Sequence, residues 1–455
     1  MSDTQGRQDV QVSAAVSDTS ASSRLYLAYA LPAAPLACLG LPLYALVPTY
    51  YTETIGLSLA AVGFVLLLIR FFDAAIDPVV GVLSDLFRPH FGRRRTALLI
   101  SLPVAALAAL MLYWPPKDAS IAWLGFWGIV LSLGFTMATV PYSAWGAELV
   151  TGYRERSSLA AYREGLTLVG TLIAILLPFG IGFGKDQAMS GLAWLGIVIA
   201  ISLPLAGLVT IVVCPEPKEY STTRLSLQQS LGFLFANKPF LRLLAAFFLN
   251  GFANGIPATL FLYFVSDRLG LPDARGPLLF LYFLCGIAGV PLASVAAKRL
   301  GKHRAWCLAM IAACVAFAVA PLLPVGSLYG FAAICVITGL LLGFDLVIPP
   351  AIQADVIDLD TAQSGEQRSG LYFSAWGLAT KLSLAAGVGL VFPVLFAFGF
   401  EPSATTSNTE TALFALAVTY AWVPIGLKLM AIALMWNFPL DEKAHRIVRD
   451  QIDRA

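Results

Sequence analysis

Twelve apolar segments, most of them long enough to cross a lipid bilayer, recur along this 455-residue chain. A membrane-spanning helix needs about 20 predominantly apolar residues, because the bilayer core offers no water to bond its backbone. Charged residues make up only 12% of the chain, roughly half the fraction usual in soluble proteins. The pattern predicts an all-α integral membrane protein with twelve transmembrane helices. The segments lie at roughly 26–50, 58–83, 97–114, 121–148, 161–184, 192–213, 240–266, 276–297, 304–324, 327–350, 371–398 and 411–437.

The longest internal polar link follows the sixth segment and divides the chain into two groups of six segments. The sequence therefore predicts two six-helix bundles, at 25–213 and 239–437, joined by a cytoplasmic central loop at 214–238. Residues 1–24 are rich in Ser, Asp, Gln and Thr, which predicts a disordered tail. Residues 438–455 form a second predicted tail.

Basic residues gather in the links after the even-numbered segments and at the end of the chain. Because cytoplasmic loops carry an excess of Lys and Arg, we expect both termini in the cytoplasm and a multi-pass location in the plasma (inner) membrane. The residues on that side are Arg88, Arg93, Arg94, Arg95, Arg154, Arg156, Lys218, Arg224, Lys238, Lys298, Arg299, Lys302, Arg304, Lys443, Arg446, Arg449 and Arg454. The alternate links hold Lys117, Lys185, Arg268 and Arg275.

The two halves of the chain share a sequence repeat. The tripeptide Leu-Gly-Phe at 133–135 recurs at 342–344, which is 209 residues later. At the same offset, the Gly-containing basic turn at 91–95 recurs in weaker form at 300–304. A duplicated six-helix unit is typical of transporters that hold substrate near the bilayer midplane and rock their halves alternately.

Three charged residues, Arg70, Asp73 and Asp77, interrupt the second apolar segment. Their spacing places them on one side of a helix. A charged side chain in hydrocarbon is costly, so such residues face a protein interior or a wet cavity and mark functional sites. In the structural alternative, Arg70 and Asp73 form an ion pair that holds the helix, and Asp77 bonds backbone groups freed by Pro78.

The sequence offers little for an enzyme active site. Its six cysteines lack metal-ligand spacing, and its three histidines lie in polar turns or the C-terminal tail. It contains neither a phosphate-binding P-loop nor a His-Glu-x-x-His metal motif. A membrane-embedded enzyme is thus the weakest interpretation. We expect no cofactor, no nucleic-acid partner and no metal beyond a possible sodium ion.

Several motifs carry a family resemblance over nearly the whole chain. The most specific is Arg-Phe-Phe-Asp-Ala-Ala-Ile-Asp-Pro at 70–78, and the basic turn from Gly81 to Arg95 is a broader signature. On these motifs the chain resembles the major facilitator superfamily and, within it, the glycoside–pentoside–hexuronide:cation symporters (the melibiose-permease group). The resemblance implies the major facilitator fold. The other matching motifs are Tyr50-Tyr51-Thr52-Glu53, Pro141-Tyr142, Glu155-Arg156, Tyr162-Arg163, Ala354-Asp355-Val356-Ile357-Asp358 and Lys381.

The resemblance implies that the helix-two carboxylates bind the coupling cation. Asp73, Asp77 and Thr136 match the family's ligands, although the Thr136 hydroxyl has the alternative of bonding its own helix. A small hard cation needs several oxygen ligands, whereas a proton needs one buried carboxylate. Ile76 stands where sodium-coupled members have an amide, so one oxygen ligand is missing. Either a proton or a sodium ion is therefore compatible with the sequence as the coupling ion, and the missing ligand argues against sodium.

The substrate side departs further from the family. Galactoside-specific members have acidic and tryptophan side chains where this chain has an alanine in helix one, Thr139 and Ser143 in helix four. Tyr142 lies in the same segment, and the cation Arg163 is retained unless Glu164 pairs with it locally. A cavity that keeps cations and loses acids suits an anionic or less polar substrate better than a neutral disaccharide.

Further candidates lie inside the C-terminal apolar segments. Lys381 is a candidate coupling residue, because an ammonium that pairs with a helix-two carboxylate links ion occupancy to conformation. Asp345 has no evident partner, and Asn254 either lines a cavity or bonds a neighbouring helix. Trp376 either stacks on a sugar ring or anchors a helix end. Lys428 is expected to snorkel towards the cytoplasmic side.

The sequence therefore predicts a secondary active transporter that couples a proton or sodium ion to symport of a small organic solute by alternating access. A glycoside, uronate or related sugar compound is the expected substrate, and a lysolipid or other amphiphile is the alternative. Asp85, Arg93, Arg94 and Arg95 are expected to latch the halves on the cytoplasmic face. The expected partners are the substrate, the cation and the lipid bilayer, and the chain is expected to be a monomer.

Overall fold

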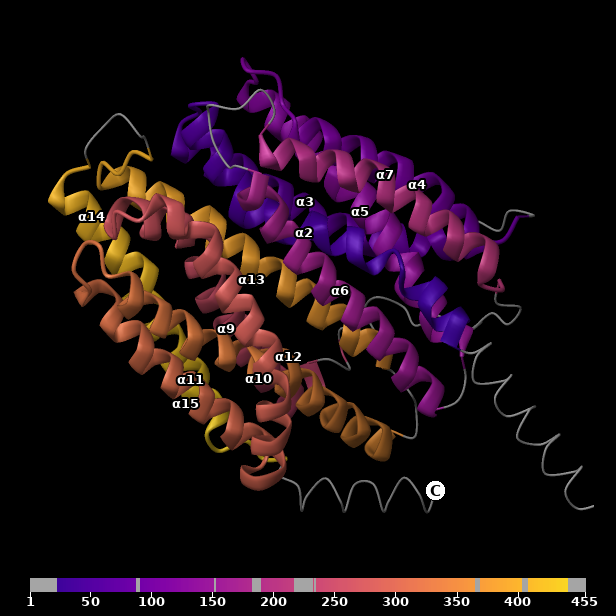
Figure 1. Ribbon diagram of the computed structural model, residues 1–455. Coiled ribbons are helices and arrows are strands. Elements are labelled where there is room, and N and C mark those ends of the chain that lie inside the picture. Colours follow the sequence, from indigo (N-terminus) through magenta and orange to yellow (C-terminus); the bar gives the residue numbers. More distant parts are fainter. Residues whose placement is uncertain are drawn as a thin grey trace, which may run out of the picture. The chain divides into compact units, whose positions relative to one another are not determined.

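The computed structural model describes residues 23–86, 91–150, 153–181, 190–216, 232, 235–364, 369–402 and 408–440. In these residues all regular secondary structure is helical (Figure 1). The described part contains 12 helices that are long and apolar enough to cross a membrane. The prediction of an all-α protein with twelve spans is confirmed. The predicted tails and central loop lie largely outside the described residues.

The first six spans are α2 (Ala33–Thr49) with the π-helical turn η1 (Tyr50–Thr54), α3 (Leu59–Leu86), α4 (Arg93–Tyr113), α5 (Ile121–Leu149), α6 (Tyr153–Ile181) and α7 (Gly191–Val213). The last six are α9 (Lys238–Tyr263) with η2 (Phe264–Arg268), α10 (Arg275–Leu300), α11 (Lys302–Val319), α12 (Leu328–Ser364), α13 (Ser369–Ala397), and α14 (Glu410–Ala417) continued by η5 (Val418–Trp422) and α15 (Val423–Met435). Two short 3-10 turns are η3 (Pro272–Ala274) and η4 (Ala320–Leu322).

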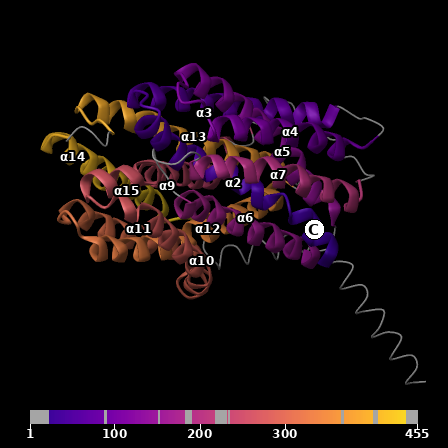
Figure 2. The same ribbon diagram turned by 45° about the horizontal axis from the view of Figure 1, so that its top comes forward.

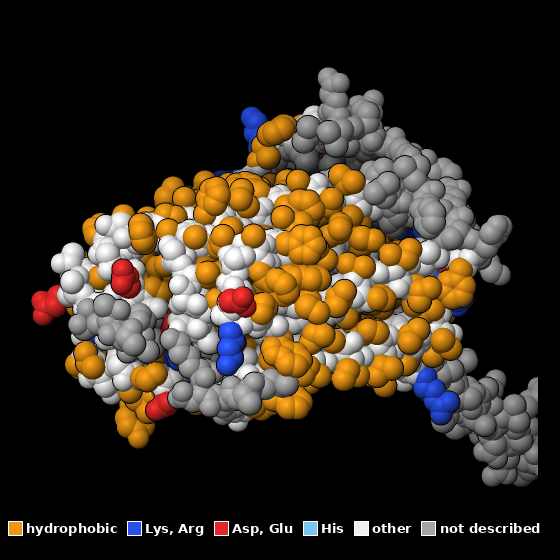
Figure 3. Space-filling model, turned by 90° about the horizontal axis from the view of Figure 1, so that it is seen from above, with side chains coloured by type: hydrophobic (Ala, Val, Ile, Leu, Met, Phe, Trp, Pro, Cys, Tyr) orange, Lys and Arg blue, Asp and Glu red, His pale blue; other side chains and the backbone are white. Residues whose placement is uncertain are grey.

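The helices expose large apolar side chains, as a lipid environment requires. Phe126 is 61% exposed, Val212 77% and Phe414 61%, all of them on predicted spans. On the face drawn in Figure 3, hydrophobic side chains cover most of the described surface and charged side chains are few. A soluble protein rarely presents so extensive an apolar surface, so these faces are suited to contact lipid.

The chain forms two compact units, each built from several separate stretches. The first unit holds residues 1–42, 75–116 and 126–221. The second holds residues 43–74, 117–125 and 222–455. Helix α3 therefore contributes its first part to the second unit and its remainder to the first. The division into bundles at 25–213 and 239–437 stays a prediction.

Glycines at equivalent positions support the sequence repeat. Gly92 has φ 107° and directly precedes α4, and Gly301 has φ 83° and directly precedes α11. Positive φ is strained for residues with a Cβ, so both turns favour glycine. The two positions are 209 residues apart, the offset found in the sequence. Both basic turns thus have a glycine with positive φ immediately before the next helix.

In the second unit, α10 and α12 pack through small residues and lie side by side (Figures 1 and 2). A Cβ added to Gly289 would overlap the carbonyl of Leu340, and one added to Gly343 would overlap the backbone of Gly289. Close approach of backbones through glycine is a common basis of helix association in membranes.

Replacing Gly289 with alanine is therefore expected to destabilise the second unit by about 1–3 kcal/mol, the usual cost of overpacking. The obstacle is backbone, which cannot rotate away. Gly426→Ala in α15 is the matched control, because its added Cβ would meet nothing within 4 Å. Thermal unfolding of the purified variants in detergent measures both effects. Equal melting temperatures for the two variants would contradict this account of the α10–α12 contact.

Candidate functional site

The carboxylate of Asp73 lies between two cationic side chains in the second unit. Asp73 is 4% exposed in the middle of α3. Its Oδ1 lies 3.1 Å from Nζ of Lys381 on α13, and its Oδ2 lies 3.9 Å from Nη1 of Arg70. The Lys381 ammonium also donates to the backbone carbonyl of Asp73 at 3.4 Å. The structure thus brings together three residues that sequence reasoning selected.

Glycines bring α3 and α13 close together about two to three helical turns away from the Asp73–Lys381 pair. A Cβ on Gly63 would overlap Phe392, and one on Gly389 would overlap Leu67. The two helices thus pack against each other there, and Lys381 on α13 reaches Asp73 on α3 further along the same helices. A buried carboxylate without a counter-charge is strongly unfavourable, so the pair with Lys381 makes its burial tolerable.

The second carboxylate of α3 belongs to the first unit and has a neutral partner. The hydroxyl of Thr136 on α5 donates to Oδ1 of Asp77 at 2.9 Å, and Thr136 is fully buried. This bond runs between helices, so Thr136 does more than bond its own backbone. Asp77 follows Asp73 by one helical turn, yet one carboxylate is held by an ammonium and the other by a hydroxyl.

These contacts limit the chemistry that a cation finds at Asp73. A sodium ion at this carboxylate has to compete with Lys381 and Arg70, both of which are positively charged. A proton instead removes the negative charge that holds Lys381. Among the described residues, no group of three or more His, Cys, Asp and Glu side chains is arranged to hold a metal ion.

Tyr142 forms a reciprocal clamp with Tyr29 inside the first unit. Their rings stack with centroids 4.6 Å apart, and the Tyr29 hydroxyl donates to the Tyr142 carbonyl at 2.9 Å. The Tyr142 hydroxyl donates in turn to the Tyr29 carbonyl at 2.8 Å. Tyr142 is buried, so its hydroxyl serves packing between the first and fourth spans in this structure.

Arg163 lies beside this tyrosine pair and is bonded locally. Its guanidinium donates to Oε1 of Glu164 at 2.7 Å, and it is close enough to both tyrosines to influence them electrostatically. Thr139 donates to the carbonyl of Phe135 on its own helix at 2.9 Å. Ser143, the other helix-four candidate, is exposed. The helix-four positions thus present small polar groups in place of acids.

Asp345 is the centre of a buried polar network in the second unit. Its Oδ1 accepts from Trp306 at 2.7 Å and from Asn250 at 3.0 Å, and its Oδ2 accepts from Asn254 at 2.8 Å. Both asparagines accept in turn from the Lys428 ammonium, at 2.7 Å and 2.8 Å. Each amide therefore bridges the two charges, with its NH2 towards the carboxylate and its oxygen towards the ammonium. Of the two roles predicted for Asn254, the structure shows hydrogen bonding to neighbouring helices.

The prediction that Lys428 snorkels is wrong. Lys428 is 2% exposed, and its ammonium bonds two side chains of α9 inside the bundle. Snorkelling places a charged head in water, whereas here the partners are provided by protein. Trp376 also has a protein partner, since its ring stacks on Phe247 at 3.7 Å between centroids. The charges of Asp345 and Lys428 are tolerated inside the membrane because they are opposite in sign and are bridged by the two asparagine amides.

The basic turn is bonded to the end of the sixth span in the first unit. The Glu216 carboxylate accepts from the backbone N–H of Arg94 at 2.8 Å and of Arg95 at 3.3 Å. The Arg95 guanidinium donates to the Cys214 carbonyl at 2.9 Å. A carboxylate on the first N–H groups of α4 offsets the positive end of its dipole. Arg93 and Arg94 are largely buried, and the side chain of Asp85 lies outside the described residues.

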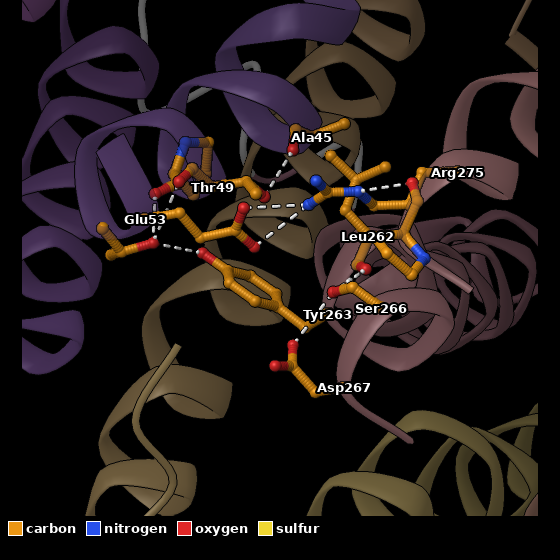
Figure 4. A network of polar contacts seen from close by, with 11 residues as sticks. Ala45, Thr49, Glu53, Leu262, Tyr263, Ser266, Asp267 and Arg275 are labelled. Carbon is orange, nitrogen blue, oxygen red and sulfur yellow. Dashed lines mark hydrogen bonds and ion pairs between the residues drawn. The ribbon is translucent and has the colours of Figure 1, made fainter. Parts of the chain in front are cut away.

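Sequence reasoning did not single out two further contacts of the second unit, shown in part in Figure 4. Glu53 pairs with Arg275 at 2.9 Å, and the Tyr263 hydroxyl shares a hydrogen bond with Thr52 at 2.8 Å. A sequence signal existed: the segment around Glu53 recurs around Asp267. Its offset differs from the 209 residues that relate the other repeated segments, so that offset does not reveal it.

Comparison with known proteins agrees with this architecture. Residues 28–442 match the family described as MFS/sugar transport protein. The glucuronide carrier protein homolog of Escherichia coli (strain K12) is 24% identical over 420 residues, covering 89% of this chain and 90% of the relative. The putative glycoside/cation symporter YagG of the same organism is 26% identical over 391 residues, covering 83% of each.

Solved structures show the same fold. A bacterial homolog of the human lysosomal transporter Spinster superposes with a TM-score of 0.65 at 14% identity, covering 95% of this chain and 98% of that chain. The resemblance to glycoside–pentoside–hexuronide symporters is thereby confirmed, as is the expectation of a transporter in place of an enzyme. With the family match extending over nearly all of its length, the chain belongs to the MFS/sugar transport proteins.

Proposed function

We propose that this protein is a proton-coupled symporter of an anionic sugar, such as a uronate or an acidic glycoside. The observation that carries the proposal is the buried Asp73 carboxylate held 3.1 Å from the Lys381 ammonium. Such a pair has two states, because protonation of Asp73 removes the charge that fixes Lys381. The protein acts as a monomer in the plasma (inner) membrane.

The coupling follows from competition for Asp73. With the carboxylate ionised, Lys381 ties α13 to α3 and satisfies the buried charge. With the carboxylate protonated, the ammonium needs another anion, which a negatively charged substrate supplies. Proton and anionic substrate therefore stabilise the same state, and each raises the affinity for the other by the same factor. Ile76 and the cations around Asp73 favour the proton over sodium as the coupling ion.

The substrate class is supported by charge and by the relatives. The helix-four positions Thr139 and Ser143 lack carboxylates, while Arg163 and Lys381 retain positive charge. Two relatives are named for a glucuronide and for glycosides. An anionic sugar combines both properties, because its hydroxyls suit small polar groups and its carboxylate suits the cations.

Uptake into proteoliposomes tests the proposal directly. An inward proton gradient is expected to drive accumulation of radiolabelled glucuronide at least about tenfold over a gradient-free control, whereas a sodium gradient at fixed pH leaves it unchanged. A tenfold accumulation corresponds to about 1.4 kcal/mol. Accumulation that follows the sodium gradient would overturn proton coupling. Uptake of a neutral disaccharide or of a lysolipid in preference to glucuronide would overturn the substrate class.

A further inference from the structure

Two short segments of the chain repeat each other in sequence. Residues 50–57 read Tyr-Tyr-Thr-Glu-Thr-Ile-Gly-Leu, and residues 264–271 read Phe-Val-Ser-Asp-Arg-Leu-Gly-Leu. Both have an aromatic first residue, a hydroxyl third, an acid fourth, and an aliphatic-Gly-Leu end. They lie at the same end of the first and the seventh span. Glu53 and Asp267 therefore occupy equivalent positions.

The segments also share their backbone conformation. Each begins with a π-helical turn, η1 or η2, and contains a glycine with positive φ, 85° at Gly56 and 68° at Gly270. Single π-helical turns occur frequently at functional sites. Two backbone hydrogen bonds recur as well: Ile55 N to Tyr50 O at 3.2 Å matches Leu269 N to Phe264 O at 3.0 Å, and Leu57 N to Tyr51 O at 3.0 Å matches Leu271 N to Val265 O at 2.9 Å.

In this structure the first segment is bonded to two residues that flank the second segment, Tyr263 and Arg275 (Figure 4). Nη1 of Arg275 donates to both carboxylate oxygens of Glu53, at 2.9 Å and 3.1 Å. The hydroxyls of Thr52 and Tyr263 share a hydrogen bond of 2.8 Å, and both residues are buried. The side chains of Glu53 and Arg275 are 21% and 12% exposed, so solvent screens this ion pair only in part.

The equivalent acid, Asp267, lies within electrostatic range of the same arginine. Arg275 and Glu53 both act on Asp267 electrostatically, and Asp267 accepts a hydrogen bond from Ser266 at 3.0 Å. Asp267 lies in the short connection between α9 and α10, and Arg275 is the first residue of α10. That connection is fixed by Gly326 N to Leu269 O at 2.8 Å and by Arg268 to Pro321 O at 3.0 Å. The position of Asp267 relative to Arg275 therefore does not depend on the contact with Glu53.

We propose that Thr52, Glu53, Tyr263, Asp267 and Arg275 form a gate, the η1–η2 latch, in which Arg275 exchanges one carboxylate for the other. Arg275 pairs with Glu53 when the ends of the first and seventh spans are together. It pairs with Asp267 when they separate. The proposal rests on the transport function, since alternating access requires these ends to part in each cycle.

The exchange lowers the cost of opening. Breaking a partly buried ion pair by removing one partner leaves an uncompensated charge, which is strongly unfavourable. A second acid beside Arg275 replaces the lost partner, so the open state keeps a paired arginine. The repeat accounts for the two acids, because it places an acid at the same position in both segments. Arg268 in the second segment donates to the Pro321 carbonyl, and Arg275 is the arginine that pairs with Glu53.

Distance measurements between spin labels test the latch without substrate or ion gradient, so their outcome is independent of the substrate and coupling-ion assignments. Labels are attached at Ser58→Cys and Tyr329→Cys, both exposed positions, and Cys285 is replaced by alanine. The other native cysteines are buried. Burial raises the pKa of the Cys214 thiol to about 12, although Arg95 lowers it, so this thiol resists labelling at pH 7.

The two acid substitutions are expected to act in opposite directions. E53Q is expected to raise the ratio of long to short label distances roughly tenfold, because it removes the ion pair of the closed state. The factor lies between those expected for loss of an exposed and of a buried ion pair. D267N is expected to lower the ratio by a similar factor, because it removes the ion pair of the open state. E401Q, at an exposed acid after α13, leaves the ratio unchanged. Shifts in the same direction for E53Q and D267N, or no shift in either, would overturn the latch.

A charge reversal provides a second test that does not depend on either single variant. The double variant E53R with R275E restores an ion pair in the closed state. It also places two acids together in the open state, because Asp267 remains. We expect the short distance to dominate at least as strongly as in the unsubstituted protein. A double variant that opens as readily as E53Q would contradict the exchange.

Discussion

Asp73→Asn is expected to reduce proton-driven uptake about 100-fold, near the upper limit of coupling between two sites. Asparagine has the shape of a protonated aspartate but cannot release a proton. The Lys381 ammonium, 3.1 Å from Oδ1 of Asp73, then faces a permanently neutral group. The variant therefore remains in the state that the proton normally produces, and no proton moves with the substrate.

The same variant is expected to retain substrate exchange across the membrane, because exchange does not require release of the proton. Uptake driven by a proton gradient and exchange at equal pH are measured on the same proteoliposomes. Asp118→Asn is the matched control, since this acid is exposed in the loop before α5. Full proton-driven uptake by the Asp73 variant would place coupling elsewhere. Loss of exchange together with uptake would show a general defect in transport.

Substitutions in the Asp345 network are expected to have the largest effects on stability. Asp345→Asn leaves Lys428 buried and without a counter-charge, which destabilises the second unit by about 3–5 kcal/mol. Lys428→Met is expected to cost less, because Asp345 keeps the donors Trp306, Asn250 and Asn254. Unfolding in mixed micelles, followed by intrinsic tryptophan fluorescence, measures the free energy of unfolding of each variant and so tests which substitution destabilises more.

The double variant D345N with K428M removes both charges and is expected to recover part of the loss. Non-additivity of this kind measures the coupling between the two charges. The contrasting control is Lys302→Met, which breaks the pair of Lys302 with Asp355 at 2.6 Å. Lys302 is 39% exposed, so solvent screening reduces the expected cost to about 0–1 kcal/mol. Additive losses in the double variant would show that the bridging amides do not couple the charges.

The number of spans followed from sequence because hydropathy is local. Each span could be recognised from its own residues, and the structure has 12 such helices. The prediction that Asp73 and Asp77 lie on one side of the same helix also followed from local sequence, because residues four apart in a helix lie one turn above each other. The repeat of 91–95 and 300–304 likewise predicted two equivalent turns, now seen at Gly92 and Gly301.

The partner of each charge did not follow from sequence. Lys381 was equally compatible with either helix-two carboxylate, and the structure places it on Asp73. Lys428 was expected to snorkel because it lies nearer the cytoplasmic side of its helix, yet Asn250 and Asn254 hold it in the protein interior. In both cases the preferred partner comes from another helix, and its availability depends on packing.

Local composition thus determined that this chain crosses the membrane twelve times and which helices carry charges. The tertiary structure alone decided which charges meet, because Lys381 and Asp73 are 308 residues apart and join only when α13 packs on α3. Hydrophobic burial depends on each segment by itself, whereas an ion pair depends on the relative position of two segments. Glu53 and Arg275, 222 residues apart, follow the same rule.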